Sequence, residues 1–164
     1  MIKYLFYFIL ASGLFSQTAC LQDSDKIKSC YSDKLTDKEK VFTKMLNEPH
    51  FKGGHDSLVS FLSANIDFEK FIGDFSQNER TNSDTARIRF IVNKQGGISD
   101  LSINMTKKKS FADEVTRVIK KSSCNWVAGG SERPANGWHQ FDIYYSIEKP
   151  SDKEVKTIMT INEL

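Results

Sequence analysis

Two neighbouring stretches of the chain alternate apolar and polar positions with a period of two, which is typical of half-buried β-strands. In residues 85–93 the inward positions are Ala86, Ile88, Phe90 and Val92. A turn containing Gly96 and Gly97 follows, and the alternation resumes over 101–105. This pattern predicts an antiparallel hairpin, preceded by a polar loop over 76–84.

The clearest strand pattern lies near the end of the chain, over 138–149, where Pro150 is expected to stop it. One face carries His139, Phe141, Ile143, Tyr145 and Ile147. The other face carries Trp138, Gln140, Asp142, Tyr144 and Ser146. Residues 155–161 are expected to form a fourth strand.

Two segments show the spacing of amphipathic helices. The first begins near Asp56, and its apolar residues are Leu58, Phe61, Leu62 and Ile66. The second is expected to be capped by Ser110, with Phe111, Val115, Val118 and Ile119 on its apolar stripe. A shorter helix over 41–46 is predicted from the capping-box pattern of residues 36–39.

This order of elements predicts an α+β fold, a small antiparallel sheet made of the hairpin and the last strand, with two helices packed on one face. The opposite face carries polar side chains and can meet water. They are Arg87, Arg89, Gln140, Asp142 and Tyr144.

The first nineteen residues have the order of a secretory signal peptide, with Lys3 before an apolar run over 4–15 and small residues before Cys20. The run is shorter than the roughly 18–20 residues that span a bilayer. The segment resembles a bacterial lipoprotein signal, in which the cysteine carries the lipid, although Gln17 replaces the usual aliphatic residue. Ordinary cleavage nearby and a retained anchor are the alternatives.

If Cys20 carries lipid, Cys30 and Cys124 remain. Export permits a disulfide, so we expect these two cysteines to be joined, with two buried thiols as the alternative. A catalytic cysteine is the weakest interpretation, because neither residue stands in a recognisable motif with a histidine.

Composition narrows the class of protein further. The 164 residues are 39% apolar and 27% charged, which is typical of one globular domain. Lys and Arg number 23 against 21 Asp and Glu, so the charge pattern favours no nucleic-acid partner. Four segments are expected, a signal peptide over 1–19, a polar tether over 20–40, a domain over 41–149 and an extension over 150–164.

Several stretches together resemble the C-terminal domain of TonB, in the form common in Bacteroidetes-type bacteria. The sequence over 49–54, Pro-His-Phe-Lys-Gly-Gly, is similar to the lead-in of that domain, and 57–66 to its first helix. Residues 88–99 resemble its hairpin, and 112–121 with Trp126 resemble its second helix. The resemblance covers about 41–147.

The chain also departs from that family. Asn65 is followed by Ile-Asp-Phe-Glu rather than an aromatic-proline pair, and the family pattern has no cysteine near Cys124. An energy-transducing TonB needs a membrane helix and a long Pro-rich spacer. This chain shows a short tether instead, so we do not expect it to transmit force to a receptor by itself.

The search for chemistry yields no catalytic residues, no metal site and no cofactor site. His50 and His55 are five positions apart, which is a poor spacing for a metal. Gly96-Gly97 fits a hairpin turn rather than a phosphate loop. We therefore expect a protein that is not an enzyme.

The resemblance implies capture of an extended protein segment, such as part of an outer-membrane receptor, beside the last strand. Trp138, Gln140, Asp142 and Tyr144 would then flank the incoming segment. In the alternative, 155–161 pairs with this strand and covers its edge, which would favour a structural envelope lipoprotein. We expect an exported, lipid-anchored protein on the periplasmic side of the envelope.

Overall fold

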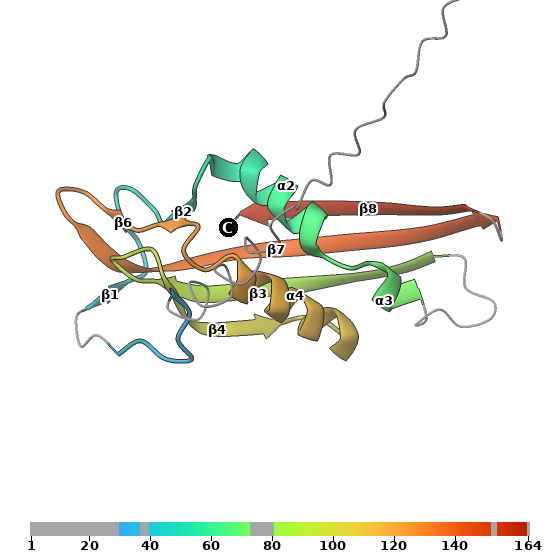
Figure 1. The fold of residues 1–164 in the computed structure, drawn as a ribbon, viewed down its shortest axis with the longest axis horizontal. Coiled ribbons are helices and arrows are strands. Elements are labelled where there is room, and N and C mark those ends of the chain that lie inside the picture. Colours follow the sequence, from blue (N-terminus) through green and yellow to red (C-terminus); the bar gives the residue numbers. More distant parts are fainter. Residues whose placement is uncertain (1–29, 37–39, 73–80, 152–153, 164) are drawn as a thin grey trace, which may run out of the picture.

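A computed structural model describes residues 30–36, 40–72, 81–151 and 154–163, and the expected signal peptide and Cys20 lie outside these ranges. The fold is α+β, with helices packed on one face of a mostly antiparallel sheet (Figure 1). The main strands are β3 (Thr81–Val92), β4 (Ile98–Asn104), β7 (Pro134–Ser151) and β8 (Glu154–Glu163).

The sheet is built around β7, which pairs with β3 on one side and β8 on the other. The antiparallel β3–β7 ladder runs from Thr81 opposite Glu148 to Val92 opposite Gly137. β4 follows β3 through the predicted turn and occupies the far edge. The predicted hairpin and last strand are therefore confirmed, and the fourth strand lies beside the last.

β3 starts earlier than the sequence pattern indicates, because polar residues of the expected 76–84 loop belong to the strand. Asn82 and Asp84 are buried. One oxygen of Asp84 accepts hydrogen bonds from the Thr106 hydroxyl (2.6 Å) and from the Lys107 and Lys108 backbone N–H groups (3.0 and 3.1 Å). These two polar side chains therefore do not face solvent, and Asp84 holds the backbone at residues 106–108, directly before the next helix.

β7 continues through Pro150 instead of ending before it. The pairing of β7 with β8 shifts register between Glu148 and Ser151. Proline is tolerated at such an irregularity because its missing N–H removes no regular ladder bond.

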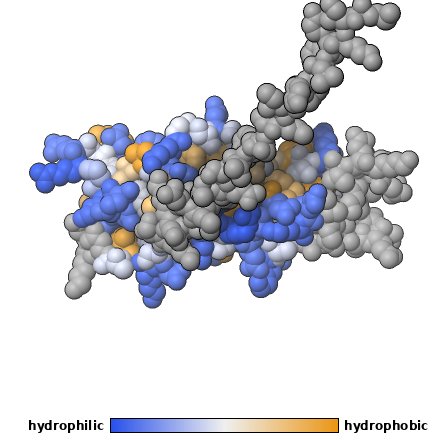
Figure 2. All heavy atoms as spheres, viewed as in Figure 1, coloured by the Kyte–Doolittle hydropathy of each residue, from blue (hydrophilic) through white to orange (hydrophobic). Residues whose placement is uncertain are grey.

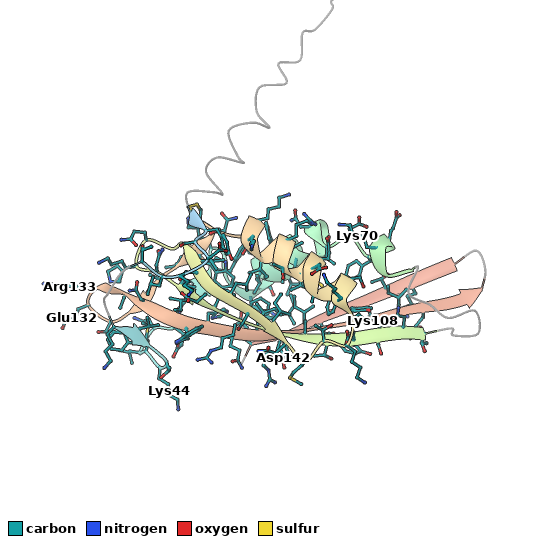
Figure 3. The ribbon with its side chains drawn as sticks, turned by 90° about the horizontal axis from the view of Figure 1, so that it is seen from below. Lys44, Lys70, Lys108, Glu132, Arg133 and Asp142 are labelled. Carbon is teal, nitrogen blue, oxygen red and sulfur yellow. A yellow bond between two sulfur atoms is a disulfide. The ribbon has the colours of Figure 1, made fainter. Side chains whose placement is uncertain are left out.

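The helices are α2 (Gly54–Asn65), α3 (Glu69–Ile72) and α4 (Lys109–Lys121), and none of the described helices is long and apolar enough to span a bilayer. They lie on one side of the sheet in Figure 3. α2 and α4 confirm the two predicted amphipathic helices. The expected Ser110 cap is wrong, since the N-cap is Lys108 and the Asp84 carboxylate binds the N–H groups there.

Between the helices and the sheet lies an aromatic core. The largest fully buried side chains include Trp126, Tyr145, Phe90, Phe111 and Phe141. Tyr145 contacts Phe111 with ring centroids 4.5 Å apart, and Trp126 contacts Phe90 at 4.9 Å. The alternating residues of β3 and β7 thus pack directly against α4 and the segment that follows it.

The predicted helix over 41–46 is wrong. Val41 and Phe42 form β1, which pairs in parallel with Asn136 and Gly137. Leu46, which the helical spacing placed on an apolar face, is 86% exposed. A short isolated helix is marginal in water. Pairing with β7 instead gives the backbone of Val41 and Phe42 hydrogen-bond partners in the sheet.

Short strands hold the segment after β1 against the rest of the domain. β2 (His50–Phe51) pairs with β5 (Trp126–Val127), and β6 (Gly129–Gly130) pairs with the start of β7. The face drawn in Figure 2 is mostly hydrophilic, with apolar spots at the end that carries β1, β2 and β6 and a further apolar area in the other half of the molecule.

The structure joins Cys30 to Cys124 by a disulfide, with Cα atoms 5.4 Å apart. The segment beside Cys30 lies against β4, where Tyr31 bridges Ile98 in parallel. Lys120 lies over the Tyr31 ring at 4.5 Å. This first part of the expected tether is therefore packed onto the domain.

Candidate functional site

The edge of β7 that faces away from β3 is covered by two different strands, with an interval between them. β1 pairs with Asn136 and Gly137, and β8 begins to pair at Phe141. Residues 138–140 have no paired strand on this side among the described residues. We call this interval, Trp138 to Gln140, the edge opening.

The register shows which backbone groups face the edge opening. Asn93 donates its N–H to the Gly97 carbonyl across the β3–β4 turn (2.9 Å), so its backbone faces β4. Backbone groups of successive residues in an antiparallel strand face opposite sides. Val92 therefore faces β7, where it lies opposite Gly137.

The same alternation continues along β7. Gly137 and His139 direct their backbone groups toward β3, and Trp138 and Gln140 direct theirs toward the edge opening. The edge opening therefore presents the two N–H and two C=O groups of these two residues.

A cavity of about 660 Å³ occupies the edge opening. Its floor is β7, and its other walls are the segment after β1 and the last described residue of β8. The lining includes Thr43, Met45, Pro49, Trp138, Gln140 and Glu163. This volume lies within the range of about 300–1,000 Å³ that ligand sites span.

Arg89 and Trp138 form one side of the cavity. The guanidinium carbon of Arg89 lies 4.1 Å from the centre of the Trp138 ring. Arg89 stands directly opposite Gln140 in the sheet, so both side chains lie on the face without helices. The stack holds a planar cation beside the exposed backbone of the edge opening.

His139 points to the opposite, apolar face and packs against the Trp126 ring with centroids 4.8 Å apart. Burial lowers the pKa of His139, while the charge of Glu163 and a hydrogen bond with the Pro49 backbone act in the opposite direction. Its Nε2 has no hydrogen-bond partner among the described residues. The ring is therefore a neutral wall of the cavity at pH 7.

The carboxylates that line the cavity already have partners. Glu163 Oε1 lies 3.4 Å from His55 Nδ1, and Glu48 Oε1 accepts the Met45 N–H at 2.9 Å. The cations Lys44 and Arg89 form no ion pair with any residue in the described part of the chain. Lys44 projects on the side of the sheet away from the helices (Figure 3).

Of the four residues expected to flank a partner, Trp138 and Gln140 lie in the edge opening. Asp142 and Tyr144 lie beside β8, opposite Asn162 and Thr160. β8 thus covers the edge over that part of β7, as in the alternative considered from the sequence. The Tyr144 side chain remains 38% exposed on the open face.

No family model, curated protein or solved structure matches the chain. What the site can do follows from its geometry. Exposed strand groups above a cavity can bind an extended segment through main-chain hydrogen bonds. In the part of the chain that the structure describes, no group of three His, Cys, Asp or Glu side chains is placed to hold a metal ion.

The sequence pattern did not identify Arg89 or Lys44 as part of the site. Arg89 could have been found, because the alternation of both strands places it on the same face as Gln140. Lys44 could not, because the pairing of β1 with β7 carries no local signal.

Proposed function

We propose that this protein is a non-enzymatic cell-envelope protein with a TonB-like domain, and that it binds an extended protein segment by strand addition at the edge opening. The observation that carries this proposal is the interval in the β7 edge. Trp138 and Gln140 direct ladder groups into a cavity there, and no strand of the described residues pairs with those groups.

The resemblance to TonB domains supports a link to outer-membrane receptor transport, with a receptor segment as the partner. The leader pattern and Cys20 support an exported protein held by lipid on the periplasmic side. The Cys30–Cys124 disulfide is compatible with such an oxidising compartment.

A photo-cross-linking residue at position 140, in intact Gram-negative cells that make the protein, tests this function. We expect an adduct with a second protein, whose cross-linked segment is identified by peptide mapping. Position 142 is less suitable because it lies beside β8. Ser60, an exposed residue of helix α2 that lies on no strand edge, is the control and should form no adduct.

β8 favours a second candidate function, a structural envelope lipoprotein that retains the fold without capturing a peptide. Its pairing with β7 covers Asp142 and Tyr144, half of the residues expected to flank a ligand. Absence of an adduct from position 140, with the protein folded and located in the envelope, would support this candidate. A thiol-dependent enzyme is less well supported, because Cys30 and Cys124 are joined.

A further inference from the structure

The edge opening is closed at both ends by strands of this chain. β1 ends with Phe42 opposite Gly137, and β8 reaches Glu163 opposite Phe141. Four residue steps separate these positions on β7, which is about 13 Å at roughly 3.3 Å per residue. A strand running along β7 would collide with β1 at one end and with β8 at the other, so a partner must end within the cavity or turn away.

We infer that the edge opening binds the free C-terminus of a partner polypeptide, an inference that rests on the proposed function. The last residues of the partner extend beside Trp138 and Gln140. Their main chain bonds with the outward N–H and C=O groups, and the terminal carboxylate lies near the Arg89 guanidinium.

The position of Arg89 beside the edge opening favours a carboxylate over an amine there. The carboxylates of the lining each already have a contact within the chain, Glu163 with His55 at 3.4 Å and Glu48 with the Met45 N–H at 2.9 Å. Arg89 has no acidic partner among the described residues, and its guanidinium lies over the Trp138 ring, 4.1 Å from the ring centre. A guanidinium in a fixed position binds a carboxylate through charge-assisted hydrogen bonds.

Lys44 adds a second cation at the rim of the same cavity. Because this side chain is exposed and flexible, we expect it to attract the carboxylate rather than to position it. Arg89 is therefore the residue that should distinguish a free C-terminus from an internal segment.

Two peptide libraries test the inference with the full-length, disulfide-bonded protein. One displays random heptapeptides that end in a free carboxyl group, and the other displays the same heptapeptides followed by a Gly-Ser tail. We expect enrichment from the first library only. The best peptide is then synthesised as the free acid and as the C-terminal amide for fluorescence polarisation.

We expect the amide to bind at least tenfold more weakly than the acid, because it loses a charge-assisted interaction. Arg89→Gln should weaken binding of the acid by about tenfold and abolish the difference between acid and amide. Arg89→Lys should retain part of that difference. Lys107→Gln removes an exposed cation at the start of α4, away from the cavity, and should bind as the unmodified protein does.

The outcomes separate this inference from the proposed function. Equal enrichment of both libraries, or equal affinity for acid and amide, would overturn C-terminal recognition and leave segment binding intact. An acid-to-amide difference that persists in Arg89→Gln would overturn the role of Arg89. If neither library is enriched, binding of an extended segment fails, and the inference fails with it.

Discussion

Arg87 and Asp142 form a two-pronged ion pair across the open face of the sheet. Arg87 Nε lies 2.8 Å from Asp142 Oδ1, and Nη2 lies 2.9 Å from Oδ2. The two residues are direct partners in the β3–β7 ladder. The hydrogen bonds from Arg87 lower the pKa of Asp142. The carboxylate expected from the sequence to meet a ligand is thus engaged in holding the register of two strands.

Replacing Asp142 by Asn should lower the urea midpoint of unfolding at pH 7. Because the pKa of the folded carboxyl lies below its ordinary value of 3.8, the ion pair stabilises the fold above that value. Its contribution is lost as pH falls through the folded pKa, so the variant and the parent should converge in acid. Asp113→Asn, which removes an exposed pair with Lys109, is the control and should shift the midpoint much less.

Glu114 is the buried acid that joins α4 to the segment around α3. It is 3% exposed and lies 2.7 Å from Lys70 Nζ and 2.6 Å from Arg117 Nη2. Hydrogen bonds from Arg117, followed by those from Lys70 and the Asp67 backbone, lower its pKa from 4.5 to about 2 despite burial. The interactions should contribute fully above pH 4.5 and be lost as pH falls toward 2.

Glu114→Gln should therefore lower the free energy of unfolding at pH 7, by on the order of 2–3 kcal/mol. The difference from the parent should shrink steadily between pH 4.5 and pH 2, measured by urea unfolding at each pH. A difference that stays constant over that range would show that packing, rather than charge, is responsible.

The Cys30–Cys124 bond should contribute strongly to stability, because 94 positions separate the two cysteines. If the bond acts by restricting the unfolded chain, closing a loop of this length adds roughly 4–5 kcal/mol to the free energy of unfolding. Adding a reductant should lower the thermal midpoint of the parent protein. A Cys30→Ser, Cys124→Ser double variant should unfold at the reduced midpoint with or without reductant, and any response of that variant would point to another effect.

Gln140→Pro tests the main-chain part of the proposed site. The substitution removes an N–H that faces the edge opening and keeps the backbone bonds between β7 and β3. We expect it to bind the selected peptide about tenfold more weakly than Gln140→Ala, which lacks the same side chain but keeps the N–H. Equal affinities of the two variants would show that this N–H does not contact the ligand.

The alternating residues of β3 and β7 are what made the centre of the sheet predictable. Apolar residues alternate with polar ones from His139 to Ile147, and this period of two indicates which side chains face the core. The two strands pair without a register shift from Thr81 to Val92. Helices α2 and α4 were predicted for a similar reason, because a single apolar stripe on each packs against the core.

The boundaries of the site were less predictable because they depend on contacts distant in sequence. Val41 belongs to a strand only because Asn136 lies beside it. Residues 155–161 could be identified as a strand, but nothing local showed whether they would cover Asp142 and Tyr144. The edge opening lies between Phe42 of β1 and Glu163 of β8, and the pairings that place these two residues on β7 carry no local signal.

The disulfide also determines how the domain bears tension. Cys30 lies at the start of the described chain, and the bond transfers a pull applied there directly to Cys124. With the bond intact, residues 31–123, including α2, β3, β4 and α4, form a closed loop that cannot be drawn out straight. A pull between Cys30 and the end of β8 can extend only the segments outside that loop, so β8 and the segment directly after Cys124 would bear the load before any strand within the loop.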